Sequence, residues 1–443
     1  MKKLLYVASS YGHILSFHIP YIKKLQEMEF EIHVAAVGVF EKTEANAIKE
    51  DELRNIPKTN IPFQKKMFSL KNLSCTLQLV RLIKKERHDV ISVHTSLAAF
   101  FVRLAVMLIR GRKPKVINTV HGYLFDQDTP FFKRNIFVFA EKITKSATDV
   151  LVVMNQQDYE IAEKYHLYKK RLVKIPGVGI DTQRFSRKKV EEELIRNEVN
   201  NGDKNGLTAN AEANNIQKLD MEVLRRTERL RFGIGENDIV LIYAAEFSKR
   251  KNQRMLIEAM EKLPANVKLL LAGKGEQLEE CKKLAEHLNL NLTEHFNLNE
   301  EQAAKQSFQI GDRVLFLGHV KDLEYYYYLS DICVSSSRSE GLPFNIMEAM
   351  AMGLPIVATN VKGHQDIVEA GVNGYLYGFD NQQEFIKAIL RLINTKEARS
   401  KVQDIHAETW DHYLKMSQNN MLKAQKYKLE NVIDEVLDVY NEL

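Results

Sequence analysis

Short runs of β-branched and other apolar residues alternate along the chain with longer stretches of helical periodicity. In the first part, helical patterns such as HIPYIKKLQEM, LVRLIKKERH and FVFAEKITKSA separate the apolar runs KLLYVAS, EIHVAAVG, DVISVHT, KVINTVHG and DVLVVMN. This alternation is typical of βαβ units around a parallel sheet. We therefore expect an α/β domain over residues 1–180, with KLLYV as its first strand rather than as part of a secretion signal.

A second α/β series covers residues 232–418, with apolar runs such as DIVLIYAAEF, VKLLLAGKG, RVLFLGHV and PIVATN. Between the two series, residues 186–231 are charged and polar. We interpret them as an insertion or linker, either a docking loop or a mobile excursion flanked by helices. Residues 419–443 carry apolar positions at helical spacing and predict one closing amphipathic helix. The expected fold is two Rossmann-like doubly wound domains that face each other across a cleft, where ligands bind beyond the strand ends.

Composition places the chain among globular cytosolic proteins. The 443 residues are 45% hydrophobic and 27% charged, which excludes collagen-like, mucin-like and wholly disordered classes. The longest apolar stretch, 97–109, is interrupted by Arg103 and is shorter than the roughly 20 residues of a membrane span. Cys75, Cys281 and Cys333 lie far apart in no metal-ligand or disulfide pattern, so we expect three buried thiols in a reducing compartment.

Charge is distributed unevenly between the two parts. Residues 1–180 contain 29 Lys and Arg against 17 Asp and Glu, a net +12, whereas the remaining residues carry a net −7. Such asymmetry indicates a polyanionic partner for the first part, either an anionic membrane or a nucleic acid, or else ordinary solvated charge. No nucleic-acid-binding motif accompanies the charge, so we expect no nucleic-acid partner.

The most informative segment is SSRSEGLPFNIMEAMAMGLPIVAT. It predicts a strand, a turn at Gly341, a helix that begins near Pro343, and a stop at Gly353. The free amides of the first helical turn suit an anion such as a diphosphate. Two carboxylates, Glu340 and Glu348, bracket that position and could hold hydroxyl groups. The other candidate donor-binding residues of the turn are Leu342, Phe344 and Asn345.

In this segment the chain resembles the family 4 retaining glycosyltransferases of the GT-B fold, whose signature places two glutamates eight positions apart. The resemblance covers most of the chain apart from 186–231 and is strongest toward the bacterial capsule and exopolysaccharide branch. It implies that Glu340 contacts the transferred sugar and Glu348 the ribose of a nucleotide sugar. It further implies a UDP-hexose or UDP-N-acetylhexosamine as donor.

Four further positions match the family. The turn at Gly12 matches the loop that approaches the donor phosphate, and His121 matches the loop that lines the sugar and acceptor side. The strand that ends near Val320 would lie beside the nucleotide base. IPGVGIDTQRF (175–185) resembles the interdomain hinge.

One departure concerns the two cations that hold the diphosphate. The family has an Arg followed five residues later by a Lys, but here Glu246 stands at the Arg position while Lys251 is kept. Either Arg250 substitutes, or Lys251 and the helix amides suffice, or Glu246 turns away. We favour Lys251 assisted by Arg250.

The resemblance implies chemistry without a resident cofactor. No enzymatic nucleophile is evident, so we expect a front-face substitution in which Glu340, His121 and Lys251 position and stabilise the reacting groups. No metal is expected, because the Asp126-Gln127-Asp128 triplet follows the His121 loop and not the diphosphate segment. Lys- and Arg-rich segments with aromatic residues, such as FFKRNIFVFAEK, favour docking on an anionic inner leaflet that carries a lipid-linked or oligosaccharide acceptor.

Two alternatives remain open at this stage. The chain could be a non-catalytic, glycosyltransferase-like partner subunit whose donor site is lost with the missing Arg. It could also be a sugar-nucleotide epimerase of the same architecture, which would convert a donor without any acceptor. A Rossmann oxidoreductase is disfavoured, because Gly273-Lys274-Gly275 lacks the third glycine of the dinucleotide fingerprint.

Overall fold

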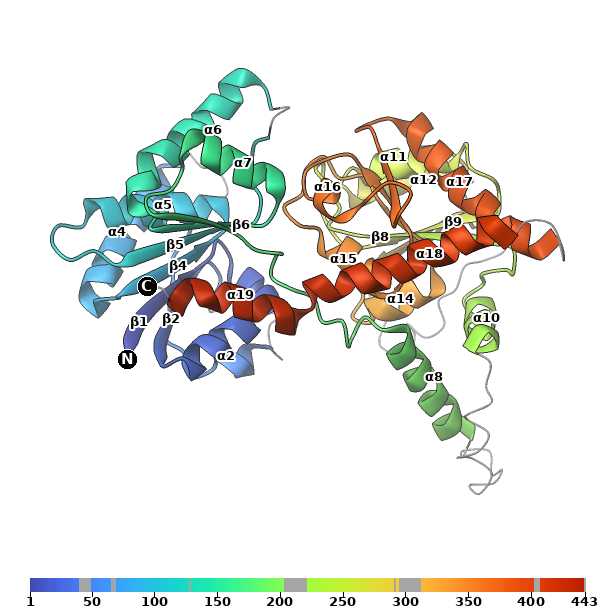
Figure 1. The fold of residues 1–443 in the computed structure, drawn as a ribbon, viewed down its shortest axis with the longest axis horizontal. Helices are drawn as coiled ribbons and strands as arrows, with labels where there is room; N and C mark the ends of the chain where they lie inside the picture. Colours follow the sequence, from blue (N-terminus) through green and yellow to red (C-terminus); the bar gives the residue numbers. More distant parts are fainter. Residues whose placement is uncertain are drawn as a thin grey trace. The chain divides into compact units, whose positions relative to one another are not determined.

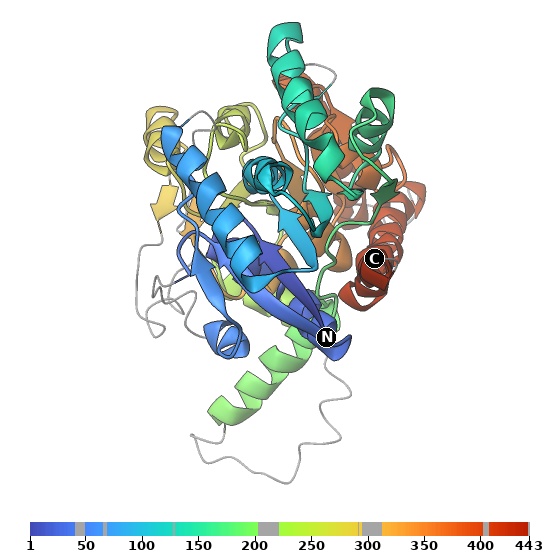
Figure 2. The same cartoon turned by 90° about the vertical axis from the view of Figure 1, so that its left-hand side faces the viewer.

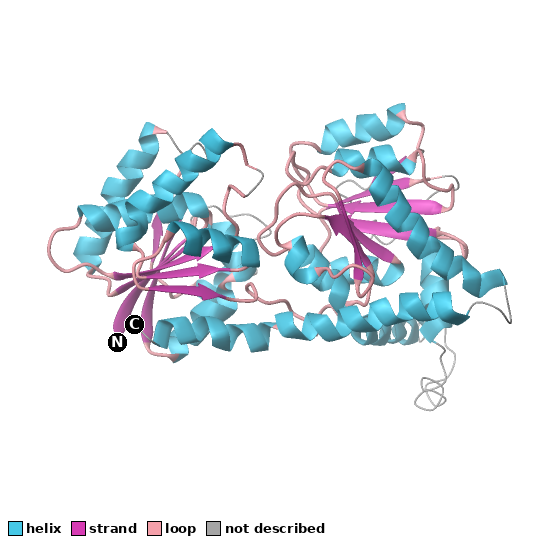
Figure 3. Cartoon of the chain, turned by 45° about the horizontal axis from the view of Figure 1, so that its top comes forward, coloured by secondary structure: helices cyan, strands magenta, loops and turns pink. Residues whose placement is uncertain are grey.

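The computed structural model of the chain describes residues 1–39, 49–64, 69–126, 129–202, 221–290, 292–294, 312–401 and 407–441. These residues form two compact units. The first comprises Met1–Gly179 with Leu429–Leu443, and the second comprises Ile180–Lys428. Each unit is a parallel sheet between layers of helices (Figure 3). This confirms the expected α/β class with doubly wound sheets.

In the described part of the first unit, seven strands pair in the order β3-β2-β1-β4-β5-β6-β7 (Figure 1). The central strands β4 and β6 are buried on both faces, as is typical of parallel strands, whereas the edge strands β3 and β7 are half-buried or exposed. The strands are β1 (Lys2–Val7), β2 (Phe30–Ala36), β3 (Lys58–Asn60), β4 (Val90–His94), β5 (Lys115–Val120), β6 (Val150–Val153) and β7 (Arg171–Lys174). The helices are α1 (Tyr11–Phe17), α2 (Ile19–Glu27), η1 (Asp51–Leu53), α4 (Leu70–Glu86), α5 (Ser96–Leu108), α6 (Phe131–Thr144), η2 (Lys145–Ala147), α7 (Gln156–Tyr165) and α19 (Leu429–Asn441).

Helices α4, α5 and α6 cover one face of this sheet, and α2 and α19 cover the other (Figure 1). Figure 2 shows α4 beside α5 across the strands. The core between α4, α5 and the sheet is built from aliphatic side chains and includes Cys75. Arg103 on α5 is fully buried and makes a bidentate pair with Glu141 of α6, at 2.8 and 3.0 Å.

In the described part of the second unit, seven strands pair in the order β10-β11-β9-β8-β12-β13-β14. They are β8 (Ile239–Ala244), β9 (Val267–Ala272), β10 (Leu292–Glu294), β11 (Val314–Gly318), β12 (Ile332–Ser335), β13 (Ile356–Thr359) and β14 (Gly374–Tyr377). The helices are α8 (Arg187–Gly202), α10 (Met221–Arg231), α11 (Gln253–Met260), α12 (Leu278–His287), α14 (Leu323–Leu329), α15 (Phe344–Ala351), α16 (His364–Ile367), α17 (Gln382–Lys401), α18 (Ala407–Ala424) and η5 (Gln425–Tyr427).

Several expectations about the connecting and terminal segments can be compared with this arrangement. Within the predicted 186–231 insertion, α8 and α10 belong to the second unit, and residues 203–220 lie outside the described residues. The single closing helix expected over 419–443 is wrong. Lys428 has extended backbone angles, φ −59° and ψ 132°, which end the helical path between α18 and α19.

The three cysteines are buried and carry free thiols, as expected. Burial raises the pKa of the Cys281 thiol to about 12. Of the helices in the described part of the chain, none is both long enough and apolar enough to cross a membrane.

Candidate functional site

The segment that links β12 to α15 forms the centre of the site. Strand β12 is fully buried, and α15 begins at Phe344 with Pro343 as its N-cap. The N-cap residue Pro343 makes no side-chain cap hydrogen bond. Gly353, at φ +72°, follows the end of α15. The strand, turn and helix predicted from the sequence are therefore confirmed, and the start of α15 lies where the sequence predicts an anion-binding position.

Glu340 lies in this turn and is surrounded by hydrogen-bond donors. Its carboxylate accepts from Lys251 Nζ at 2.5 Å, from Ser337 Oγ at 2.5 Å and from the Arg250 guanidinium at 3.1 Å. Burial alone would raise the pKa of Glu340, but the charges of Lys251 and Arg250 outweigh burial and lower the pKa to about 2. Glu340 is therefore an ionised, rigidly held acceptor at any physiological pH.

Lys251 and Arg250 come from the loop between β8 and α11, which is joined to the Glu340 turn by hydrogen bonds. Ser336 Oγ donates to the Lys251 carbonyl at 2.9 Å, and the Arg338 amide donates to the Arg250 carbonyl at 2.8 Å. The Lys251 side chain is 12% exposed, whereas that of Arg250 is 49% exposed. The structure thus brings both predicted cations to Glu340, the more buried one being Lys251.

Glu246, at the position where the family has an Arg, is exposed. Its backbone carbonyl accepts from the Gln253 side chain at 2.9 Å. Of the three sequence-based explanations for the missing Arg, an outward-facing Glu246 fits this exposure, and it is compatible with Lys251 and Arg250 as the local cations.

Glu348 lies four residues into α15 and has a different environment. The Tyr327 hydroxyl lies 3.3 Å from its carboxylate and also contacts the Asn345 carbonyl at 3.0 Å. Burial raises the pKa of Glu348 to about 7, although the charge of Arg184 and the contact with Tyr327 act in the opposite direction. The two predicted glutamates therefore differ sharply: one is always ionised, and the other changes charge near neutrality.

Asn345, between the two glutamates, is 7% exposed, and its side-chain amide Nδ2 has no hydrogen-bond partner among the described residues. Leu342 is also buried, and Gly341 is half-buried. A buried donor without a partner is costly in a folded protein. The Asn345 amide is thus a buried donor that the described part of the chain leaves unsatisfied.

Sequence analysis missed the groups that support the turn from behind. The Thr359 hydroxyl donates to the Ser337 carbonyl at 2.6 Å, and His364 Nδ1 lies 2.8 Å from the Thr359 carbonyl. Gly363 has φ +80°, and a Cβ there would lie 2.5 Å from the Gly341 carbonyl oxygen. The signal in the sequence was the Gly363-His364 pair shortly after a buried strand, comparable to His121, which also follows a strand.

The remaining predicted site residues are placed as follows. Val320 is half-buried in the loop between β11 and α14.

The glycine turn predicted at Gly12 is wrong, because Ser10 caps α1 and Gly12 lies in its first helical turn. A Cβ at Gly12 would meet no described atom within 4 Å, so the position does not require a glycine. Asp126 pairs with Thr129, and residues 127–128 lie outside the described residues.

His121 belongs to the first unit, in the loop after β5. It is half-buried, and its Nε2 lies 3.2 Å from Nδ1 of His94. His94 is the last residue of β4, so both histidines lie at the carboxyl end of a strand. Burial lowers the pKa of His121 to about 3, so its imidazole is neutral at physiological pH. His121, His94, His13 and His18 form one group of imidazoles. Nothing in the sequence indicated that His18 or His94 belongs to the site.

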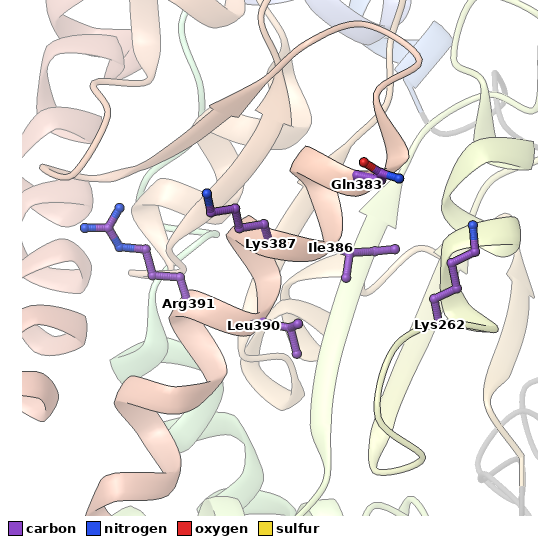
Figure 4. Close-up of a pocket in the computed structure, with 6 residues that line it drawn as sticks. All are labelled: Lys262, Gln383, Ile386, Lys387, Leu390 and Arg391. Atoms are coloured by element: carbon purple, nitrogen blue, oxygen red, sulfur yellow. The ribbon is translucent and has the colours of Figure 1, made fainter.

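A hollow of about 640 Å³ lies elsewhere on the second unit, beside α17 (Figure 4). Lys262 lies on one side of it, and five residues of α17 lie on the other. No residue of the Glu340–Glu348 segment lines this hollow. It contains no acid, nucleophile or imidazole among its lining side chains, so it adds nothing to the chemistry of the site.

Comparison with known proteins matches each unit to a family model. The model "Glycosyltransferase Family 4" matches residues 21–184, and "Glycosyl transferases group 1" matches residues 238–395. The Bacillus subtilis protein EpsD, named as a glycosyltransferase, is 28% identical over 99% of this chain and 96% of its own length. An Escherichia coli UDP-Gal:alpha-D-GlcNAc-diphosphoundecaprenol alpha-1,3-galactosyltransferase is 23% identical over 74% of this chain and 72% of its own.

Solved structures agree on the fold. Anabaena Alr3699/HepE in complex with UDP-glucose matches with a TM-score of 0.67 at 17% identity, over the whole of both chains. WaaG, a glycosyltransferase involved in lipopolysaccharide biosynthesis, matches with a TM-score of 0.62 at 13% identity over 98% of this chain and 99% of its own. These structures show that the fold is GT-B, and the two family models with the EpsD match show that the chain belongs to the family 4 glycosyltransferases.

Proposed function

We propose that this glycosyltransferase moves a hexose or N-acetylhexosamine, with retention of configuration, from a UDP-sugar to a lipid-linked or oligosaccharide acceptor of a bacterial surface polysaccharide. The observation that carries the proposal is the ionised Glu340 held by Lys251 and Arg250 in the turn directly before α15. Two similar proteins support the choice of donor. The Anabaena structure contains UDP-glucose, and the Escherichia coli galactosyltransferase is named for UDP-Gal and a GlcNAc-diphosphoundecaprenol acceptor.

In this proposal, the leaving diphosphate is stabilised by the first amides of α15 and by Lys251, with Arg250 assisting. Preorganised donors of this kind stabilise charge that grows in the transition state. Both cations already neutralise Glu340, so a diphosphate would share them with that carboxylate. We place no metal at the diphosphate, because the two cations exceed Glu340 by one positive charge and the dipole of α15 adds to it.

Glu340 would accept hydroxyl groups of the transferred sugar, and Glu348 those of the ribose. Val320 would contact the base, and Asn345 would donate to the sugar or the diphosphate. His121 is neutral, so it would act as a hydrogen-bonding group on the sugar and acceptor side rather than as a charged one. The Gly12 region would approach the donor phosphate through α1 rather than through a turn.

The transfer itself would be a front-face substitution. The bond from the acceptor oxygen to the anomeric carbon forms on the face from which the diphosphate oxygen departs. The proton of the acceptor hydroxyl passes to that departing phosphate oxygen, so no protein nucleophile is required. The enzyme contributes positioning and charge stabilisation.

The first unit would dock on the anionic inner leaflet through an outward-facing apolar surface on α4 and α6. Phe132 is 83% exposed and Leu70 is 86% exposed. The other large exposed side chains of this surface are Leu73, Leu77, Phe131, Ile136 and Phe139. Their spacing repeats along one side of each helix, and basic residues flank them. Basic residues on α4 (Lys71, Arg81, Lys84, Lys85) and on α6 (Lys133, Arg134, Lys142) supply the positive charge that an anionic leaflet attracts.

Transfer is tested by incubating the protein, without added Mg²⁺, with UDP-glucose, UDP-galactose or UDP-GlcNAc and a synthetic polyprenyl-diphosphate-linked GlcNAc. Mass spectrometry detects the product, and NMR reads the anomeric configuration. The account predicts one donor with retained configuration and loss of transfer in Glu340→Gln. Conversion of donor without acceptor would favour an epimerase. Binding of no nucleotide sugar at all would favour the non-catalytic subunit.

Docking is tested by flotation with vesicles of neutral lipid and of neutral lipid mixed with phosphatidylglycerol. We expect flotation only with the anionic lipid, and loss of it in Phe131→Ser/Phe132→Ser. Leu422→Ser, which changes a 71% exposed residue of the second unit, serves as the matched control and keeps flotation. Equal flotation on both vesicle types, or retention by the double variant, would reject this surface as the docking site.

A further inference from the structure

The histidine group of the first unit, His13, His18, His94 and His121, lies at the carboxyl ends of neighbouring strands. His13 and His18 follow β1, His94 ends β4, and His121 follows β5, and β4 lies between β1 and β5 in the sheet. Sheet order therefore brings together residues that are up to 108 positions apart in the sequence. Side chains at this edge of a parallel sheet are usually those that bind ligands.

The imidazoles are packed around a small common space. His13 Nε2 and His18 Nε2 lie 3.2 Å apart, and one nitrogen each from His13, His18 and His121 fall within 4.8 Å of one another. Two nitrogens bound to the same tetrahedral zinc ion lie about 3.3 Å apart, given Zn–N bonds of 2.0–2.1 Å. The His13–His18 pair already has this spacing, and His121 brings a third nitrogen to within 4.8 Å of both.

Imidazole is among the commonest protein ligands of transition metals, and each neutral ring has one nitrogen lone pair to offer the ion.

A surrounding shell of polar groups orients the rings. The Tyr6 hydroxyl lies 2.9 Å from His18 Nδ1. Behind His121, His94 contacts Ser92 Oγ at 3.0 Å, and Ser92 contacts the Tyr440 hydroxyl at 2.6 Å. Partners of this kind fix the orientation of metal-binding histidines, and their loss typically weakens metal affinity 10- to 100-fold.

We propose that His13, His18 and His121 bind one divalent transition-metal ion of the zinc type in the first unit. With the ion bound, His121 acts on the sugar and acceptor side through the ion and not through a free ring nitrogen, because its Nε2 contacts His94. His94 and Tyr6 act as positioning residues that hold His121 and His18. Because His13 and His121 are half-buried while His18 is buried, the fourth coordination position is left on the more open side, for water or an anionic oxygen. This departs from the sequence-based expectation of no metal, which considered only the diphosphate and the Asp126 triplet.

The test measures metal binding directly. Full-length protein is stripped with a chelator, dialysed, and titrated with ZnSO₄ by calorimetry, and a parallel sample is loaded with Co²⁺ for absorption spectroscopy. We expect one Zn²⁺ per chain and a Co²⁺ spectrum with the intense visible bands of a four-coordinate site. Absence of stoichiometric binding, or a six-coordinate Co²⁺ spectrum, would overturn the proposal.

Variants assign the ligands. His13→Ala and His121→Ala change half-buried residues and should lower Zn²⁺ affinity at least 100-fold, while Tyr6→Phe should lower it 10- to 100-fold. His33→Ala, a half-buried histidine of the same unit outside the group, is the matched control and should bind like wild type. Unchanged affinity in His13→Ala would overturn the site, even if zinc bound elsewhere. Binding of UDP is recorded on the same samples, so failure of the metal site and failure of the donor site are distinguished.

Discussion

Replacing Glu348 by glutamine should stabilise the second unit at alkaline pH while weakening donor binding. Glutamine keeps the size of the side chain and can still accept from the Tyr327 hydroxyl, but it carries no charge. Burial raises the pKa of Glu348 to about 7 from its ordinary value of 4.5. A carboxyl group with a raised folded-state pKa binds its proton more tightly in the folded than in the unfolded state. Its contribution to stability therefore falls as pH rises from about 4.5 to about 7 and stays low above that.

The size of the effect follows from the two pKa values. Each pKa unit is worth 1.36 kcal/mol, so the ionised carboxylate costs at most about 3 kcal/mol at pH 8.5. Glu348 is half-buried, and its residual access to water reduces this cost. We expect Glu348→Gln to gain about 1 to 2 kcal/mol at pH 8.5, or about 3 to 6 °C in Tm for a unit of this size. At pH 5 the two proteins should unfold within about 1 °C of each other.

Fluorescence-detected thermal unfolding at pH 5 and 8.5 measures the effect, because the only tryptophan, Trp410, lies in α18 of the second unit. Calorimetry with UDP on the same variant should show at least a tenfold loss of affinity, since glutamine accepts hydrogen bonds from the ribose hydroxyls less strongly. A variant that is no more stable than wild type at pH 8.5 would refute the reasoning that Glu348 is a destabilising group kept for binding.

Three further changes test other parts of the structure. Lys251→Ala should leave the fold intact and lower UDP-sugar affinity more than tenfold by calorimetry, and unchanged affinity would remove Lys251 from the donor site. Arg103→Leu leaves the buried Glu141 without its partner and should cost about 3 to 5 kcal/mol in urea unfolding, most of which Arg103→Leu/Glu141→Leu should restore. Gly363→Ala places a Cβ 2.5 Å from the Gly341 carbonyl oxygen at a residue with positive φ. We expect the variant to lose about 1 to 3 kcal/mol of stability and to lose donor binding. A stable variant that still binds the donor would contradict the close approach of Gly363 to Gly341.

The strands and the helix of the donor segment could be predicted from the sequence because each is encoded locally. Buried parallel strands appear as continuous apolar runs, and the Pro343 and Gly353 positions mark the two ends of α15. The same local reasoning failed at Gly12, where a glycine after a strand suggested a turn. Ser10 caps a helix there, and a serine N-cap is a stronger signal than one glycine.

What the sequence could not show depends on contacts between distant segments. Lys251 reaches Glu340 across 89 positions, because β8 and β12 are neighbours in the sheet. The opposite pKa shifts of Glu340 and Glu348 likewise come from their surroundings and not from their spacing. The histidine group became visible only once the sheet order had placed the ends of β1, β4 and β5 together.

The central claim is that the Glu340–Glu348 segment binds a nucleotide diphosphate sugar, and calorimetry of the purified protein tests it most directly. The panel contains UDP-, GDP- and ADP-sugars, with Glu348→Ala as the comparison. The account predicts binding of UDP-sugars alone, with loss of that binding in the variant. Binding of no nucleotide sugar, or equal binding by wild type and Glu348→Ala, would contradict it.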